Sequence, residues 1–202
     1  MKTKLLTILL ALATLPVFSA VSGGVDYSSD YIWRGVSQTN GAPAWSGSLE
    51  VESNGLYGGV WASEVDFGDD AGFEYDFYGG YKLAVSDKVS LNVGVIQYNY
   101  DDGDYDATEE VFVKAHVGAF DVRYFVNADD SEKDFVAVTM NVPFIKVLDV
   151  DLEYGRHWDE TDYKLLTVSK DWKGALVGLQ VLDSARHGTF MDHAALTIGW
   201  SF

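Results

Sequence analysis

Hydrophobic and polar residues alternate with a period of two over most of this chain, most clearly in its last ten residues. Counting back from Phe202, every second residue is apolar or aromatic, whereas the residues between them are small or polar. Successive residues of a β-strand point to opposite faces, so the pattern predicts a strand at residues 193–202 with one apolar face. Such a face suits a strand that contacts lipid. An edge strand of a soluble β-sandwich is the alternative.

The same alternation divides the chain into about twelve segments, each close to the length that a tilted membrane-spanning strand needs. Short turns and longer polar loops alternate between them, and Asn54-Gly55 is typical of a tight hairpin turn. We expect the last long loop at residues 183–192. The sequence therefore predicts an all-β fold, a transmembrane antiparallel β-barrel of about 12 strands. The segments are residues 25–36, 44–52, 56–66, 73–83, 89–95, 110–117, 120–127, 135–142, 148–154, 163–170, 175–182 and 193–202.

The N-terminal segment has the features of a secretory signal peptide. Lys2 and Lys4 precede an apolar run that is too short to cross a bilayer, and small residues follow it. We expect cleavage after Ser22, with Ala20 as the alternative, so that residues 1–22 are removed and residues 23–202 form the barrel. No later segment is a long unbroken apolar run, which excludes a helical membrane protein and leaves strands as the means of crossing a membrane.

Composition and charge narrow the class of function. The chain has 202 residues, no cysteine and a formal net charge of −17, and loss of Lys2 and Lys4 with the signal peptide leaves −19. An exported chain without cysteine has no disulfides and is held by its strand pairing. The negative charge argues against nucleic acid as a partner. It agrees with attraction of cations to the mouth of a pore.

The segment that follows the signal peptide carries a distinctive motif. Residues 29–38 read Ser-Asp-Tyr-Ile-Trp-Arg-Gly-Val-Ser-Gln, and the chain ends in an aromatic residue. This motif resembles the first-strand motif of the proteobacterial TorF-like porin family. The resemblance implies an outer-membrane β-barrel that functions as a pore in transport. It does not indicate which substrate is transported.

The polar faces of the predicted strands indicate the lining of a lumen. An excess of carboxylates over basic residues there predicts a pore for passive diffusion of small solutes or ions that prefers cations. Arg34 is either a charge in the pore or a salt-bridge partner that fixes the first strand, and Gly35 permits a bulge or a close backbone contact. The candidate pore-lining residues are Asp26, Asp30, Arg34, Glu50, Glu74, Asp76, Glu110, Lys114, Arg123, Asp149, Asp151 and Glu153.

Aromatic residues gather near the ends of the predicted strands, as in the interfacial girdles of membrane barrels. We expect the barrel to contact outer-membrane lipids and lipopolysaccharide. Trp200 and Phe202 also resemble the C-terminal signal that the bacterial barrel-assembly machinery reads. The expected external girdle is Tyr31, Trp33 and Trp45, and the expected periplasmic girdle is Tyr81, Phe120, Trp172, Trp200 and Phe202.

Motifs for catalysis or metal binding are not found in the sequence. The four histidines are widely spaced, no G-x-S-x-G segment occurs, and the acidic residues 101–106 lack the spacing of an EF-hand loop. We therefore predict no catalytic residue, no cofactor and no metal site. The alternatives to a pore are a structural outer-membrane barrel with a blocked lumen and, less favoured, an outer-membrane hydrolase whose catalytic groups meet only in space.

Overall fold

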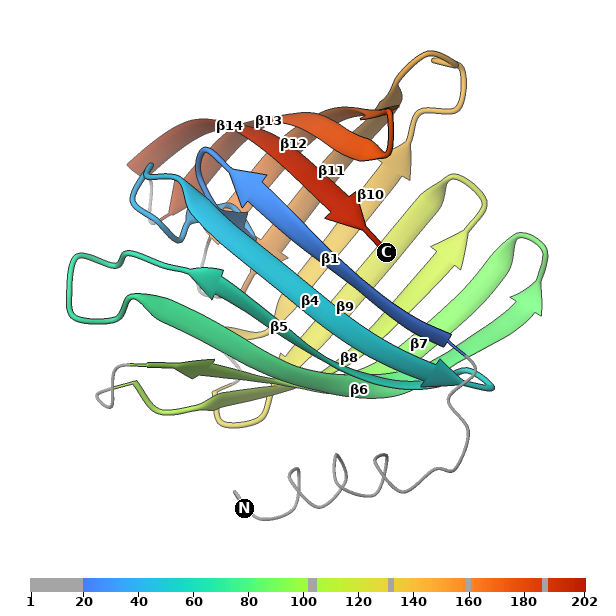
Figure 1. Cartoon of the computed structure of the whole chain (residues 1–202), viewed down its shortest axis with the longest axis horizontal. Helices are drawn as coiled ribbons and strands as arrows, with labels where there is room; N and C mark the ends of the chain where they lie inside the picture. Colours follow the sequence, from blue (N-terminus) through green and yellow to red (C-terminus); the bar gives the residue numbers. More distant parts are fainter. Residues whose placement is uncertain (1–19, 102–104, 131–132, 159–160, 187–188) are drawn as a thin grey trace.

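Twelve antiparallel strands close into one barrel in the computed structural model, which describes residues 20–101, 105–130, 133–158, 161–186 and 189–202 (Figure 1). Nearly all of the expected signal peptide lies outside these residues. Consecutive barrel strands pair with one another, and β1 also pairs with β14. The strands are β1 (Ala20–Ser28), β4 (Ala44–Ser53), β5 (Leu56–Glu64), β6 (Phe73–Ser86), β7 (Val89–Tyr100), β8 (Thr108–Val117), β9 (Phe120–Asn127), β10 (Phe135–Asn141), β11 (Asp149–His157), β12 (Thr161–Trp172), β13 (Ala175–Arg186) and β14 (Thr189–Ser201).

The barrel closes where the first and last strands meet. β1 pairs with β4 on one side and with β14 on the other, with Gly24 opposite Ser201 and Ser28 opposite Thr197. Beyond this register, Gly23 and Phe202 exchange two backbone hydrogen bonds of 2.9 Å each. Closure leaves none of the twelve described barrel strands with an unpaired edge, as a sheet in hydrocarbon requires. The predicted 12-strand antiparallel barrel is confirmed.

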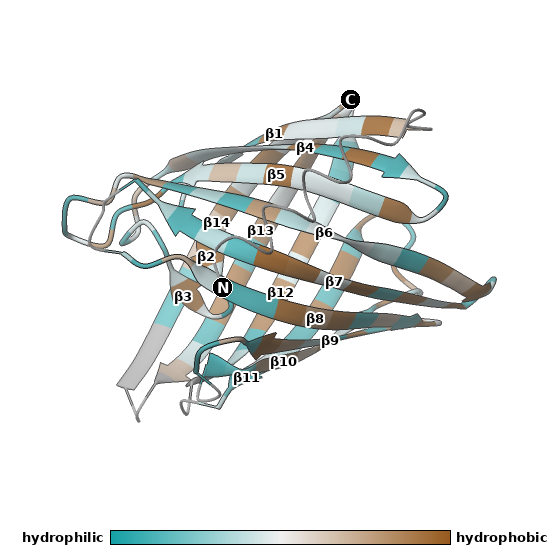
Figure 2. Cartoon of the chain, turned by 90° about the horizontal axis from the view of Figure 1, so that it is seen from below, coloured by the Kyte–Doolittle hydropathy of each residue, from teal (hydrophilic) through white to brown (hydrophobic). Residues whose placement is uncertain are grey.

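The outer wall of the barrel is apolar because the predicted alternation holds in the strands. On β6, Phe73 and Tyr75 are exposed on the outer face, whereas Glu74 and Asp76, which alternate with them, are buried inside. Hydrophobic residues recur along the strands of the wall in Figure 2. Among the described residues, no helix is long and apolar enough to cross a membrane.

Two connections differ from the prediction. β13 and β14 continue through most of the expected loop at residues 183–192, with Asp183 paired to Asp192, so the connection between these strands is residues 187–188. The link between β10 and β11 is longer than a tight turn and covers residues 142–148. Polar residues at 183–192 hid the ends of β13 and β14, because backbone pairing can extend a ladder where side-chain alternation is lost. The ends of β10 and β11 that flank the link at residues 142–148 lie within one residue of their predicted places.

The first predicted strand is wrong beyond residue 28. β1 ends at Ser28, and the chain then turns into the barrel as a small hairpin of β2 (Ile32–Trp33) and β3 (Val36–Ser37). Arg34 and Gly35 form its two-residue tip, with φ angles of 47° and 85°. Positive φ at both positions gives the turn whose twist suits a hairpin. We call residues 29–43 the inward loop.

The inward loop also corrects part of the aromatic prediction. Tyr31 and Trp33 line the lumen and do not belong to an external girdle. Their spacing continues the period of β1, so the side-chain pattern alone could not show that the chain had reversed. The other expected girdle residues, Trp45, Tyr81, Phe120, Trp172, Trp200 and Phe202, are exposed on the barrel.

The expected cleavage site lies inside β1 as the structure shows it. Ala20 pairs with Glu52 and Ser22 with Glu50 on β4. Cleavage after Ser22 stays a prediction. It would shorten β1 by three residues and leave Gly23, which bonds to Phe202, at the new terminus.

Candidate functional site: a lumen divided by an inward loop

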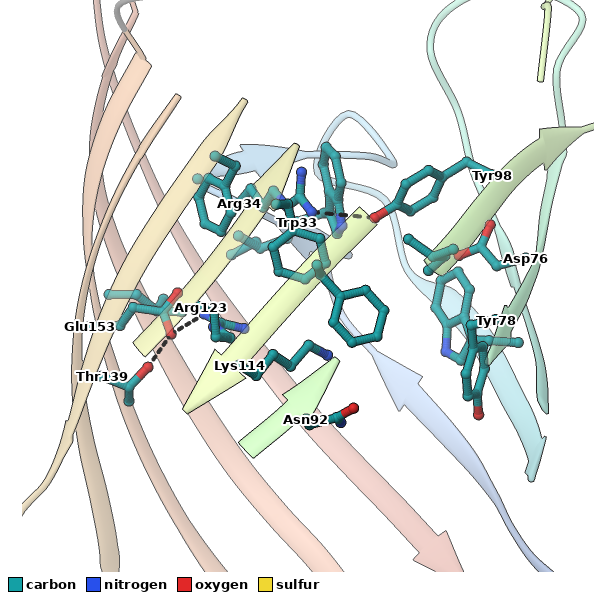
Figure 3. A pocket seen from close by; sticks show the side chains of 18 of the residues that line it. Trp33, Arg34, Asp76, Tyr78, Asn92, Tyr98, Lys114, Arg123, Thr139 and Glu153 are labelled. Atoms are coloured by element: carbon teal, nitrogen blue, oxygen red, sulfur yellow. Dashed lines mark hydrogen bonds and ion pairs between the residues drawn. The ribbon is translucent and has the colours of Figure 1, made fainter. Parts of the chain in front are cut away.

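A cavity inside the barrel has a volume of about 710 Å³. Its walls come from both sides of the lumen and its roof from the inward loop. Figure 3 shows Asp76 and Tyr78 of β6 on one side, with Arg123 and Glu153 of β9 and β11 facing them. We call this cavity the inner chamber. It lies on the side of the loop where the chain termini meet.

Arg34 at the tip of the inward loop crosses the lumen to reach β8. Its guanidinium donates two hydrogen bonds to the Glu110 carboxylate, at 2.8 and 2.7 Å. The Tyr98 hydroxyl donates a third to Glu110, at 2.9 Å. The Arg34 and Glu110 side chains are only 7% and 3% exposed. Arg34 therefore does form a salt bridge, but with a strand that is 76 residues away and not with the first strand.

Aromatic rings enclose the same guanidinium. Its central carbon lies 4.4 Å from the ring centre of Trp33, 4.3 Å from that of Phe125 and 4.4 Å from that of Phe135. Cation–π contacts of this kind strengthen when the cation is removed from water. Gly35 lies against the Tyr163 ring so closely that a Cβ atom there would be 2.6 Å from it. A glycine is needed at this position for both the backbone angle and the contact.

Asp30 anchors the base of the inward loop. It is buried, and one of its carboxylate oxygens accepts hydrogen bonds from Ser37 at 2.6 Å and Thr39 at 3.2 Å. The other lies 2.9 Å from a ring nitrogen of His193 on β14. Asp30 thus binds the loop to the barrel wall, and we assign it a structural position rather than one in an open lumen.

A second cavity of about 360 Å³ lies on the outer side of the inward loop. We call it the outer chamber. Trp33, Arg34 and Tyr98 line both chambers. These three side chains, together with Glu110, form a constriction that divides the lumen into two halves.

Most charges of the inner chamber are paired. Lys82 of β6 contacts Glu50 at 2.7 Å and Glu52 at 2.9 Å on β4. Arg123 lies 2.5 Å from Glu153, which also accepts a hydrogen bond from Thr139. Such pairs lower the cost of placing charge in a narrow lumen.

Three side chains in the described lumen lack an ion-pair partner of opposite charge and stand near the constriction. Lys114 of β8 has its ammonium 4.6 Å from the Phe112 ring centre, without a carboxylate within ion-pair distance among the described residues. Glu74 and Asp76 of β6 are 3% and 5% exposed. Each has one carboxylate oxygen that is buried without a hydrogen-bond partner.

The remaining candidates lie toward the periplasmic end. Asp151 lines the inner chamber and accepts a hydrogen bond of 2.6 Å from Asn141. Asp26 borders a hollow of about 400 Å³ beside the β1–β14 seam. Asp149 begins β11 and is exposed. Among the described residues, no group of three metal-ligating side chains is assembled.

Sequence reasoning did not identify the aromatic lining of the lumen. Phe112, Phe125, Phe135 and Tyr163 form a buried cluster inside the barrel. Phe112 and Phe125 occupy inward positions of β8 and β9, where polar residues were expected to dominate. An aromatic residue at a position that points into the lumen could have indicated this cluster. Its rings pack against the buried guanidinium of Arg34.

Solved structures with the same fold are porins of very different sequence. A KdgM porin in complex with disordered oligogalacturonate superposes with a TM-score of 0.62 at 10% identity, covering 91% of this chain and 99% of that one. A second structure, of a KdgM porin, superposes with a TM-score of 0.62 at 11% identity, covering 90% of this chain and 99% of that one. At this identity the likeness establishes the fold, a 12-strand barrel of the outer-membrane type.

Comparisons of sequence place the chain in a family. No curated protein matches it. The resemblance to TorF-like porins is supported at the coarser level of a bacterial family and a porin-like fold, and the finer assignment stays a prediction. The model of a bacterial protein family of unknown function, Gcw_chp, matches residues 13–125, which is more than half of the chain, and the protein therefore belongs to the Gcw_chp family.

Proposed function

We propose that this protein is an outer-membrane pore through which small solutes or ions diffuse passively, with a preference for cations. Three features support the proposal: a closed barrel with an apolar outer wall, a lumen with two chambers, and an inward loop that narrows the passage between them. A narrow passage restricts transport to small species, and the charges beside it then determine which ions pass.

The excess of unpaired carboxylates in the lumen is the observation that carries the cation preference. Asp76 lines the inner chamber and Glu74 is buried two residues before it on β6, and Asp26 and Asp149 lie toward the periplasmic end, whereas Lys114 is the one unpaired cation described above. A carboxylate that faces a narrow lumen attracts cations and repels anions. Arg34 and Glu110 neutralise each other and favour neither sign.

Acidic residues in the loops at the outer mouth of the barrel also attract cations. Asp66, Asp69 and Asp70 lie in the connection between β5 and β6, and Asp101 follows β7. The Tyr105 hydroxyl donates a hydrogen bond to Asp69, which lowers the pKa of that carboxyl and keeps it ionised. Exposed loop charges are screened over about 10 Å at 0.1 M salt, so their contribution should fade as salt rises.

The oligogalacturonate in the KdgM complex is an anionic chain. The charges in the lumen of this protein do not favour an anionic solute. Arg123, which could attract such a chain, is already paired with Glu153. The lumen has more unpaired carboxylates than unpaired cations, which opposes anion entry.

A barrel with a blocked lumen is the second candidate, and one observation favours it. The tip of the inward loop is held by two hydrogen bonds to Glu110 and by the rings around Arg34, so it is fixed across the lumen. The two candidates differ in conductance, because a blocked barrel would carry no current.

Planar-bilayer recording of the refolded protein tests the proposal. Folding is first established by heat-dependent gel mobility, which a closed barrel should show. We expect discrete conductance steps and, in a salt gradient, a reversal potential of the sign that cation permeation gives. A folded protein without conductance would instead support the blocked barrel, and anion preference would refute the charge argument.

A further inference from the structure

We propose that Asp76 and Glu74 form a binding site for a primary organic ammonium ion beside the constriction. The inference rests on the proposed function, since the ligand reaches the site through the lumen. It goes further by assigning a ligand class to two residues of one strand.

Aromatic rings surround Asp76. In the strand register it lies directly between Trp61 of β5 and Tyr98 of β7, and all three side chains line the inner chamber. Opposed residues in neighbouring strands have Cβ atoms about 5 Å apart. A carboxylate flanked by an indole and a phenol is a suitable receptor for an organic cation, because the ring faces attract positive charge.

The inward loop covers this group from the lumen side. Its Tyr31 ring lies 5.4 Å from that of Trp61, and its Trp33 ring lies 5.7 Å from that of Tyr98. Asp76 is therefore enclosed on three sides by aromatic side chains and remains in contact with the 710 Å³ chamber. A ligand at this site would lie at the inner entrance of the constriction.

Unused hydrogen-bond acceptors identify the chemistry of the ligand. One oxygen of Asp76 and one of Glu74 are buried without a partner. The other Glu74 oxygen accepts a 3.3 Å hydrogen bond from Tyr100, and the Tyr31 hydroxyl is a further hydrogen-bond partner of the Glu74 carboxyl. Buried acceptors are normally satisfied, so these oxygens suit a ligand with N–H donors. A primary ammonium supplies three donors and a positive charge, whereas a quaternary ammonium supplies the charge alone.

No cation of the protein takes this role in the described structure. Arg34 and Lys114 line the same chamber, but both terminal nitrogens of Arg34 bind Glu110. Lys114 forms no ion pair with Asp76 or Glu74 in the part of the chain that the structure describes, and its ammonium lies against the Phe112 ring. Lys82 is paired with Glu50 and Glu52 on β4. Two adjacent buried carboxylates without a counterion carry a high energetic cost, which a bound ammonium would remove.

Equilibrium dialysis with radiolabelled propylammonium and the refolded barrel in detergent tests the site. We expect saturable binding that unlabelled propylammonium displaces and that tetramethylammonium, of equal charge but without N–H groups, displaces at least about tenfold less well. Asp76→Asn should weaken binding about tenfold or more, and Glu74→Gln should weaken it in the same direction.

Glu109→Gln is the matched control. The variant makes the same change from carboxylate to amide at the outward-facing neighbour of Glu110. There Glu109 accepts a hydrogen bond of 3.0 Å from Gln97. The variant should leave binding of propylammonium unchanged. Both test variants are near-isosteric and remove buried charge, so they should fold, which heat-dependent gel mobility establishes.

Equal displacement by tetramethylammonium, unchanged affinity in folded Asp76→Asn, or no binding by the folded wild type would each overturn the proposal. Dialysis needs no current, so binding without conductance would refute the pore and keep the site. Conductance without binding would refute the site and keep the pore.

Discussion

Buried carboxylates differ in their partners on the two sides of the lumen. On the side of β8, β9 and β11, Glu110 and Glu153 each contact an arginine, and aromatic rings fill the space between them. On β6, Glu74 and Asp76 are about as buried as Glu110 but have no basic partner among the described residues. The difference suggests that the paired side holds the inward loop in place, whereas the unpaired side is available to ions and solutes.

Loss of the arginine at the loop tip should have the largest effect. Arg34→Ala leaves Glu110 buried without its partner, which costs about 3–5 kcal/mol and is enough to release the loop from β8. We expect single-channel conductance to rise severalfold because the constriction opens.

The double variant Arg34→Ala/Glu110→Ala serves as the control, since it removes the loop contact without leaving an unpaired charge. It should conduct as well as Arg34→Ala and be more stable. If both variants conduct like the wild type, the loop does not limit the current.

Neutralising the unpaired side should change selectivity rather than conductance. Glu74→Gln/Asp76→Asn should move the permeability ratio of cations to anions toward one, because each carboxylate contributes about 1 kcal/mol of attraction to a nearby cation in a hydrated lumen. The reversal potential in a salt gradient measures this. Unchanged selectivity in the double variant would mean that the loops at the mouth, not β6, set the preference.

The contact of the loop tip with β12 can be tested at a glycine. Gly35→Ala places a Cβ against Tyr163 and forces a non-glycine residue to adopt a φ of 85°. The left-handed conformation alone costs about 1–2 kcal/mol in the free energy of unfolding, and the contact should add to it. Gly41→Ala has a similar φ of 80° with open space around it, so it measures the conformational cost alone. Equal losses of stability in urea unfolding would show that the Tyr163 contact contributes nothing.

A change at the barrel seam, distant from both sides of the constriction, should have the smallest effect on the finished molecule. Deleting Phe202 removes two backbone hydrogen bonds to Gly23, worth about 1 kcal/mol each. The purified barrel should keep its conductance and selectivity. In cells, however, we expect precursor or periplasmic aggregates if the terminal aromatic residue is read during assembly. Normal amounts of heat-modifiable barrel would show that the C-terminal pattern is incidental.

The strands could be predicted from sequence because each barrel strand has one face toward lipid. Alternation on β6 correctly assigned Phe73 and Tyr75 to the outside and Glu74 and Asp76 to the lumen. The inward loop could not be predicted in this way. Its period continues that of β1, and its partner Glu110 is 76 residues distant, so neither the reversal at Gly35 nor the ion pair has a local signal. The lumen is therefore predictable strand by strand, but its constriction depends on long-range contacts.

The reversal potential of the folded wild-type protein in a planar bilayer, recorded across a potassium chloride gradient at low and at high salt, tests the central claim most directly. The account predicts cation preference at both concentrations. The preference should be weaker at high salt, where the loop charges are screened, but should persist because Glu74 and Asp76 are buried beside the constriction. A reversal potential of the opposite sign, or no current from folded protein, would contradict it.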